Sequence, residues 1–148
     1  MRKIMDYKNF NGTYYVRLDK DDEIIGCLMD ICRDNGIGSA TFSGIGGCED
    51  ADIMVFNAEK GTFEPERIEG ALELISVMGN ITTDEEMNYF HHTHAMFSYF
   101  KGGEHHISAG HMKATRVLYT AEIELRPVTG GRLGHKYHPE TGTGFWTL

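Results

Sequence analysis

The fold is decided by an alternating stretch late in the chain, Thr115-Arg116-Val117-Leu118-Tyr119-Thr120-Ala121-Glu122-Ile123-Glu124-Leu125. Successive side chains of a β-strand point to opposite faces, so this alternation predicts a strand that buries one face and exposes the other. Half-buried strands of this kind are typical of antiparallel sheets. The residues expected on the buried face are Val117, Tyr119, Ala121, Ile123 and Leu125.

One clear amphipathic helix is predicted between Asp19 and Gly36. Asp19 is the expected N-cap, and the three acidic residues at positions 21–23 suit the positive end of a helix dipole. Asn35 and Gly36 tolerate the left-handed backbone conformation and are expected to end the helix. Apolar residues recur at spacings of three and four, and the predicted core-facing set is Ile24, Cys27, Leu28, Ile31 and Cys32.

The rest of the chain is predicted to form mainly strands and tight turns. Strands are expected at residues 14–18, 53–56, 89–100 and 105–112, the last two joined by a hairpin-like connection at 101–104. Residues 67–81 fit either a strand or a helical turn. With strands dominant and one main helix, the predicted class is α+β with a mainly antiparallel sheet.

Two glycine-rich segments are interpreted as turns. Residues 43–47, Ser-Gly-Ile-Gly-Gly, lack the Gly-Lys-Ser/Thr ending of a phosphate-binding loop, so a tight turn is the preferred interpretation. The tail, residues 130–148, contains His-Pro-Glu-Thr-Gly at 138–142, where a turn is expected.

Composition and charge narrow the functional classes. The 148 residues include 22 acidic and 14 basic side chains, a net charge of −8, which makes the chain a poor nonspecific partner for a phosphate backbone. The length suits a single domain, 1–148, and no apolar run reaches the roughly 18 residues of a membrane helix. The early charges in residues 1–7 argue against a signal peptide, and the three cysteines are odd in number, so we expect reduced thiols and a cytoplasmic protein.

Six of the eight histidines lie between positions 91 and 111. His92 and His94 are two residues apart, so on a strand they point the same way and can converge on one ion. His111 is the leading candidate for a third ligand from the next strand, with His105 or His106 in reserve. Three imidazoles with an open fourth position are typical of catalytic zinc sites, although neutral imidazole also suits iron, nickel or copper. A divalent transition metal, with zinc preferred, is the expected cofactor.

Two alternatives do not need a metal. The segment could be a histidine-rich surface strand or subunit contact. It could also be a proton-sensing cluster, because free histidine titrates near neutral pH. Metal binding would suppress such titration, because coordinating imidazoles must be deprotonated.

Several motifs, in this order, resemble the plant-and-prokaryote-conserved (PPC) domain. The resemblance covers nearly the whole chain, with a core at about residues 14–125 and the glycine-rich tail at 130–148 outside it. The motifs are Tyr15-Val16-Arg17-Leu18, the helix at 21–35, Ser43-Gly44-Ile45-Gly46, Glu69-Gly70-Ala71-Leu72-Glu73-Leu74-Ile75-Ser76, Gly79-Asn80-Ile81, His92-Thr93-His94-Ala95 and Ala109-Gly110-His111-Met112.

The resemblance implies a curved antiparallel sheet packed with a helix and assembled as a homotrimer. The His-x-His and Gly-Gly-His-Leu motifs of prokaryotic members correspond to His92, His94 and His111, with Ala109 in place of the first glycine. Ala71 replaces an arginine of the plant motif, so a partner contact through that arginine is not expected. Bacterial members stand alone and are labelled as DNA-binding. The plant members carry AT-hooks, and this sequence has no Arg-Gly-Arg-Pro hook.

An enzyme is an alternative interpretation, because the implied fold is similar to that of acetolactate decarboxylase, which holds zinc with three histidines. The hypothesis is a zinc-dependent lyase or hydrolase that acts on a small anionic substrate, with Glu73 as a candidate for moving protons. Glu73 lies in an apolar run, so it is either buried and paired with a histidine or the ion, or a structural hydrogen-bond partner. This comparison also keeps His105 as a candidate ligand. Arg17, Arg67 and Arg116 are the candidate anion-binding residues.

A regulatory role is the other alternative. The chain would then bind DNA, or act as a metal-stabilised trimer that recruits other proteins. The most basic local stretch, residues 113–116, is short, so DNA binding has little support in the sequence.

Overall fold

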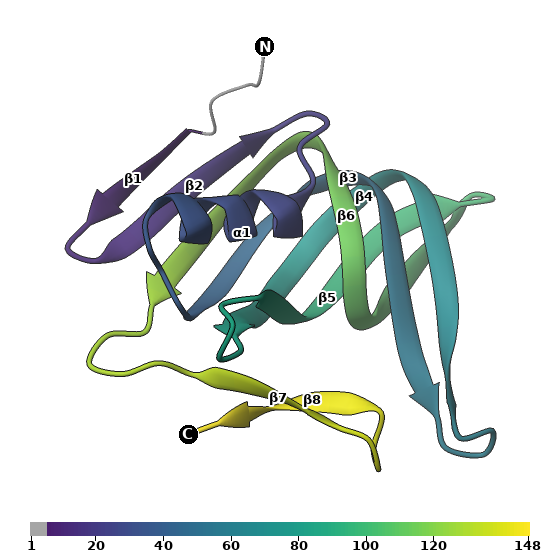
Figure 1. The fold of residues 1–148 in the computed structure, drawn as a ribbon. Coiled ribbons are helices and arrows are strands. Elements are labelled where there is room, and N and C mark those ends of the chain that lie inside the picture. The colour runs from purple at the N-terminus through teal and green to yellow at the C-terminus, as the bar shows by residue number, and fades with distance from the viewer. Residues whose placement is uncertain (1–5) are drawn as a thin grey trace.

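The structure is a computed structural model that describes residues 6–148. Residues 1–5, on which part of the signal-peptide argument depends, lie outside the described residues. Strands dominate the described chain, as predicted. The elements in chain order are β1 (Asp6–Phe10), β2 (Thr13–Asp19), α1 (Ile24–Asp34), β3 (Ala40–Asn57), β4 (Thr62–Thr83), β5 (Tyr89–Lys101), β6 (Glu104–Pro127), β7 (Gly134–His138) and β8 (Thr143–Thr147) (Figure 1).

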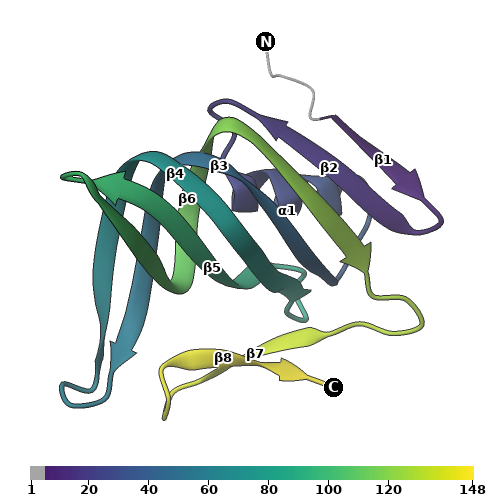
Figure 2. The same cartoon turned by 180° about the vertical axis from the view of Figure 1, so that it is seen from behind.

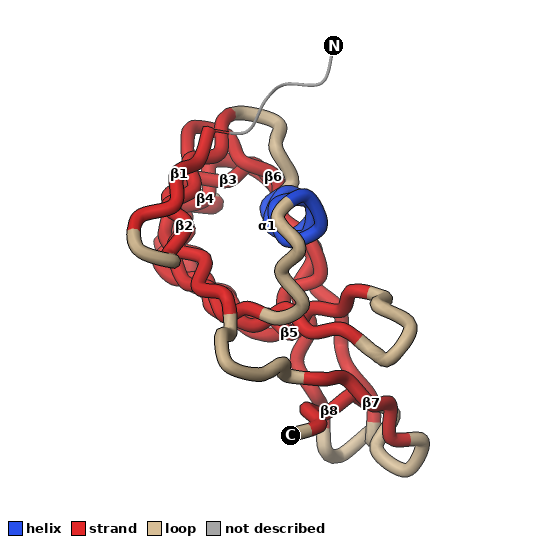
Figure 3. The backbone as a smooth tube through the Cα atoms, turned by 60° about the vertical axis from the view of Figure 1, so that its left-hand side comes forward, coloured by secondary structure: helices blue, strands red, loops and turns tan. Residues whose placement is uncertain are grey.

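A mainly antiparallel sheet joins the strands in the order β1-β2-β6-β3-β4-β7-β8, and β5 pairs with both β4 and β6. Because β3 also pairs with β4 and β6, these four strands form a closed circuit. Figure 3 shows the strands curling round, with α1 on one side of the curl. Among the described strands, β7 makes the one parallel contact, Gly134 with Thr83 of β4. Figure 2 shows the β7–β8 hairpin set apart from the long strands.

The hydrophobic core lies between α1 and the inner face of the sheet. From α1 it receives Ile24, Ile25, Leu28, Ile31 and Cys32. Its largest fully buried sheet residues are Phe97, Leu18, Leu72, Leu74, Ile81, Met112 and Leu125. No helix in residues 6–148 has the length and apolar character needed to cross a bilayer.

The helix starts later than predicted. Asp19 is the last residue of β2, and α1 begins at Ile24 with Glu23 as its N-cap. The Glu23 carboxylate accepts hydrogen bonds from the backbone N–H groups of Ile25 (3.2 Å) and Gly26 (2.6 Å), which satisfies two donors that a helix leaves unpaired. The predicted end is confirmed, because Asn35 is the C-cap and Gly36 has a φ of +66°.

The alternating stretch at residues 115–125 lies within β6, and its predicted burial pattern is correct except at one residue. Val117, Ala121, Ile123 and Leu125 are buried as predicted, whereas Tyr119 is 68% exposed. The register explains this difference, because Gly46 pairs with Ala121 and Cys48 pairs with Val117, so three β6 residues oppose one β3 residue. The irregularity turns Tyr119 away from the core.

The interpretation of residues 43–47 as a tight turn is wrong, because they lie inside β3. Their glycines serve a close approach of backbones: a Cβ at Gly46 would lie 2.6 Å from the carbonyl oxygen of Thr120 in β6. Residues 67–81, which fitted strand or helix, belong to β4.

The predicted hairpin connection at 101–104 and the predicted turn at 138–142 are both confirmed. Residues 101–104 join β5 to β6 as a hairpin, with Gly102 and Gly103 at positive φ. The turn at 138–142 joins β7 to β8, with hydrogen bonds from the N–H groups of Thr141 and Gly142 to the carbonyl oxygen of His138. The tail therefore forms a strand hairpin.

Candidate metal centre

The β5–β6 hairpin brings three of the predicted histidines together. His94 of β5 is the register partner of His111 of β6, and His92 lies two residues before His94 on the same strand face. One ring nitrogen from each of the three residues can be chosen so that all lie within 4.8 Å of one another. The ring centroids are 4.4 Å apart for His94 and His111, 5.2 Å for His92 and His111, and 5.4 Å for His92 and His94. We call these residues the His triad.

The donor set of the His triad fits a transition metal. A tetrahedral ion with bonds of about 2.0–2.1 Å holds its nitrogen ligands roughly 3.3 Å apart, so small side-chain rotations would bring the three nitrogens into range. His92 and His94 are exposed and His111 is half-buried, which leaves the site accessible from solvent. The triad could therefore hold a metal ion, and its all-imidazole chemistry does not distinguish between zinc, iron, nickel and copper.

The surroundings of the His triad favour the neutral form of two of its imidazoles, those of His92 and His111. Burial lowers the pKa of His92 and of His111, and the neighbouring His94 lowers both further. Burial also lowers the pKa of His91, whose Nδ1 lies 2.9 Å from the Thr93 hydroxyl. A metal coordinates the deprotonated nitrogen, so the lowered pKa values of His92 and His111 favour metal binding by these two residues.

Two members of the His triad, His92 and His111, line a cavity of about 760 Å³. The sheet contributes His92 and His111 together with Met54, Phe63, Asn80, Thr82 and His91. The β7–β8 hairpin contributes His135, Gly142, Thr143, Gly144, Phe145 and Trp146. The cavity therefore lies between the curled sheet and the hairpin that Figure 1 shows below it.

Specific contacts hold the β7–β8 hairpin in this place. The indole N–H of Trp146 donates to Oδ1 of Asn80 (3.1 Å), and His135 stacks on Phe90 with ring centroids 3.9 Å apart. Upstream of β7, Nη1 of Arg132 donates to the carbonyl oxygens of Thr83 (2.9 Å) and Asp84 (3.0 Å). Sequence reasoning missed this half of the cavity. The signal available was the aromatic pair Phe145-Trp146, unusual in a glycine-rich tail.

The reserve histidines lie elsewhere. His105 pairs in register with Phe100 near the hairpin turn, six residues along β6 from His111 and so roughly 20 Å away at 3.3 Å per residue. Nε2 of His105 lies 2.5 Å from the Ser98 hydroxyl, and His106 stacks on Tyr99. Neither histidine joins the triad.

Glu73 is exposed on β4, although its sequence context is apolar. Its register partner on β5 is Ser98, four residues from His94. Glu73 does not line the cavity, and its exposure does not fit the alternative in which it is buried against a histidine or the ion.

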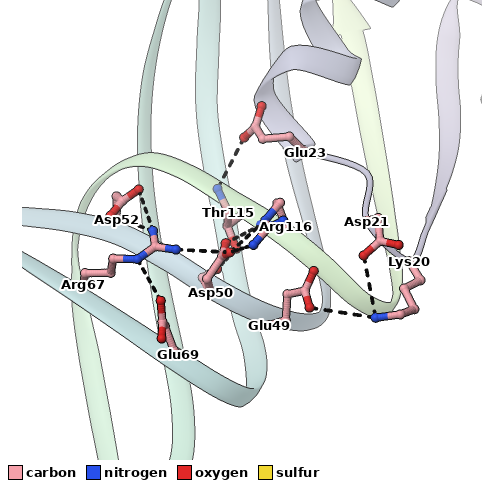
Figure 4. Close-up of polar contacts among 10 residues, drawn as sticks. All are labelled: Lys20, Asp21, Glu23, Glu49, Asp50, Asp52, Arg67, Glu69, Thr115 and Arg116. Atoms are coloured by element: carbon pink, nitrogen blue, oxygen red, sulfur yellow. Dashed lines mark hydrogen bonds and ion pairs between the residues drawn. The ribbon is translucent and has the colours of Figure 1, made fainter.

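The three candidate anion-binding arginines are paired with carboxylates. Asp50 is buried, and its Oδ2 accepts from Nε (2.8 Å) and Nη2 (2.6 Å) of Arg116, while Oδ1 accepts from the Arg116 backbone N–H (3.1 Å). Arg67 donates to both carboxylate oxygens of Asp52 at 3.0 Å and also approaches Asp50 at 3.4 Å (Figure 4). Arg17 pairs with two aspartates, Asp6 at 3.1 Å and Asp19 at 3.4 Å. None of the three arginines lines the cavity.

A protein-family model matches residues 5–129 and describes the Plants and Prokaryotes Conserved (PCC) domain, the family that the motifs resemble. The chain belongs to the PCC domain family. No match was found among curated proteins. Solved structures support the PCC fold over almost the whole length of the chain.

A PPC protein from Pyrococcus horikoshii is 25% identical, with a TM-score of 0.79 over 100% of this chain and 97% of that one. A protein from Archaeoglobus fulgidus described as metal-containing is 23% identical, with a TM-score of 0.78 over 99% of this chain and 100% of that one. A protein from Bacteroides thetaiotaomicron, provisionally named as DNA-binding, is 21% identical, with a TM-score of 0.85 over 98% of both chains.

Proposed function

We propose that this PCC domain binds a divalent transition metal, zinc in preference to iron, nickel or copper, through His92, His94 and His111. The observation that carries the proposal is the convergence of three imidazoles from two paired strands within 4.8 Å. The description of the Archaeoglobus fulgidus protein as metal-containing supports it. His105 and His106, which the sequence kept in reserve, are assigned no ligand role.

The residues around the His triad define what the site can do. A bound ion would supply Lewis-acid polarisation of an oxygen-containing ligand. The β7–β8 hairpin lines one side of the cavity, and the hydrogen bond between Trp146 and Asn80 fixes the hairpin relative to β4. Three protein ligands are typical of zinc sites that keep one position for a small molecule. We therefore place any catalytic activity in this cavity, and we assign Glu73 no role in proton transfer there.

The test is elemental analysis of protein purified without chelator and then supplied with zinc. We expect one zinc per chain in the native protein and less than about a tenth of that in His94→Ala, because two remaining imidazoles hold zinc weakly. His106→Ala is the matched control, since it removes a histidine from the same hairpin without touching the triad. Equal zinc in all three proteins would contradict the proposal.

We also propose that the chain assembles as a homotrimer, as the family resemblance implies. Its sheet carries exposed apolar side chains that assembly would cover, among them Ile45, Ile75, Met78, Met96 and Ile107. Light scattering should give about 50 kDa, three times the 16.7 kDa of one chain. A mass of one chain at micromolar concentration would contradict the trimer.

Nucleic-acid binding is the second candidate, favoured by the name given to the Bacteroides thetaiotaomicron protein. The net charge of −8 and the pairing of Arg17, Arg67 and Arg116 with carboxylates work against it. A gel-shift titration against salt decides the matter. Binding that survives physiological salt would support the DNA hypothesis, and binding lost below it would exclude a specific DNA function.

A further inference from the structure

The cavity beside the His triad has an aromatic and uncharged lining. Phe63 contacts His111 edge-to-face with centroids 5.1 Å apart, while Phe145 and Trp146 line the cavity from the hairpin. Met54 adds a flexible apolar side chain. No aspartate, glutamate, lysine or arginine is found among the described residues that line it.

The polar side chains that line the cavity are neutral amide and hydroxyl groups and four imidazoles, those of His91, His92, His111 and His135. The indole N–H of Trp146 and Oδ1 of Asn80 satisfy each other, so the Trp146 ring offers mainly apolar surface to a ligand. Phe145 and Trp146 are still 47% and 50% exposed, which is a large aromatic area left uncovered beside the His triad. Thr82 and Thr143 supply hydroxyl groups at the cavity wall. A volume of about 760 Å³ lies within the usual range of small-molecule sites.

We propose that this cavity binds a small, flat aromatic molecule that is uncharged apart from one metal-binding group. The inference rests on the proposed metal site, because the His triad would place the ion that receives that group. Stacking and edge contacts with Phe63, Phe145 and Trp146 would hold the ring. The anionic substrate considered from the sequence is disfavoured, because all three candidate arginines are paired outside the cavity.

The test uses Trp146 as its own reporter, since it is the one tryptophan in the sequence. Quenching of its fluorescence is measured in zinc-loaded protein during titration with benzohydroxamate, acetohydroxamate or oxalate. The two hydroxamates share a metal-binding group and differ in the ring, and oxalate is a ringless anion. We expect benzohydroxamate to bind at least about tenfold more tightly than either other probe. Equal affinities would overturn the inference and leave the metal site standing.

Two variants test whether the preference for the aromatic hydroxamate arises in this cavity. Phe145→Ala keeps the reporter and should reduce the preference for benzohydroxamate over acetohydroxamate to near unity. Phe100→Ala is the matched control, because Phe100 is 77% exposed, lies near the β5–β6 turn and does not line the cavity. A preference that survives Phe145→Ala, or that falls equally in Phe100→Ala, would contradict the assignment to this cavity.

A titration of metal-free protein separates the proposed metal site from the proposed aromatic cavity. Millimolar benzamide should quench Trp146 in metal-free protein, and millimolar acetamide should not, because ring contacts do not need the ion. Failure to load zinc combined with benzamide quenching would overturn the proposed metal site and keep the aromatic cavity. Zinc loading without any effect of benzamide or benzohydroxamate would overturn the aromatic cavity alone.

Discussion

Two polar clusters on the long strands, the His triad and the group around Asp50, differ in how completely their side chains satisfy one another. In the Asp50 cluster, each arginine faces at least one carboxylate, and the buried Asp50 receives donors from Arg116 and Arg67 (Figure 4). In the triad, three imidazoles face one another, and no carboxylate pairs with them in residues 6–148. The paired charges of the Asp50 cluster stabilise the fold, whereas three converging imidazoles without a carboxylate partner are suited to bind a cation.

The largest expected difference between the two clusters is in their response to zinc. We expect zinc at a thousandfold excess over its dissociation constant to raise the free energy of unfolding by about 4 kcal/mol, because it binds only the folded triad. The measurement is urea unfolding with zinc or with EDTA. The effect should vanish in His94→Ala and persist in Asp52→Ala. Equal stabilisation of His94→Ala would place the zinc elsewhere.

Removing the carboxylate of Asp50 tests the structural cluster. Asp50→Ala should lower the free energy of unfolding by about 2–3 kcal/mol, less than a fully buried pair because both arginines are half-exposed. The side chain of Asp50 is 7% exposed and that of Asp52 is 43% exposed, so Asp52→Ala is a matched control with an expected loss below about 1 kcal/mol. Zinc content should be unchanged in both variants. Similar losses would show that burial of Asp50 does not decide its contribution.

Trp146→Phe tests the attachment of the hairpin. The variant keeps an aromatic ring and removes the hydrogen bond to Asn80, which should cost about 0.5–1 kcal/mol in local stability. Hydrogen exchange of the β7 and β8 amides should become several-fold faster, while zinc content and core amides stay the same. Unchanged exchange would mean that the stacking of His135 on Phe90 and the Arg132 contacts hold the hairpin without Trp146.

The smallest expected effect is on the alkylation rate of Cys48, which lies two residues before Asp50. Burial raises the pKa of the Cys48 thiol to about 11, with a smaller contribution from Asp50, so the thiol stays protonated and unreactive at pH 8. Alkylation of native protein should therefore proceed slowly there and faster in Asp50→Ala. A rate in Asp50→Ala equal to that of native protein would show that the strand pairing around Cys48 does not depend on the Asp50 cluster.

The sequence predicted the parts of the fold that depend on local pattern. The alternation of β6, the body and end of α1 and the 101–104 connection all follow from periodicity or turn residues. Tyr119 and the N-cap of α1 depend on tertiary contacts instead. The irregular register opposite Gly46–Cys48 exposes Tyr119, and the carboxylate of Glu23 also accepts from the backbone N–H of Thr115, 92 residues away.

The candidate site was predictable only on the sheet side. His92 and His94 share a strand face by spacing, and the hairpin connection makes His111 their neighbour. The side of the cavity that the β7–β8 hairpin forms was not predictable, because Trp146 and Asn80 are separated by 66 residues and no local pattern links them. The pairing of Arg67 with Asp52 across β3 and β4 likewise depends on register, which composition does not reveal.

The most direct test of the central claim is anomalous X-ray scattering at the zinc edge, from crystals of native protein supplied with zinc. The account predicts one strong peak per chain, within about 2.0–2.1 Å of a ring nitrogen from each of His92, His94 and His111. A peak held by His105 or His106, or no peak at the triad under these conditions, would contradict it.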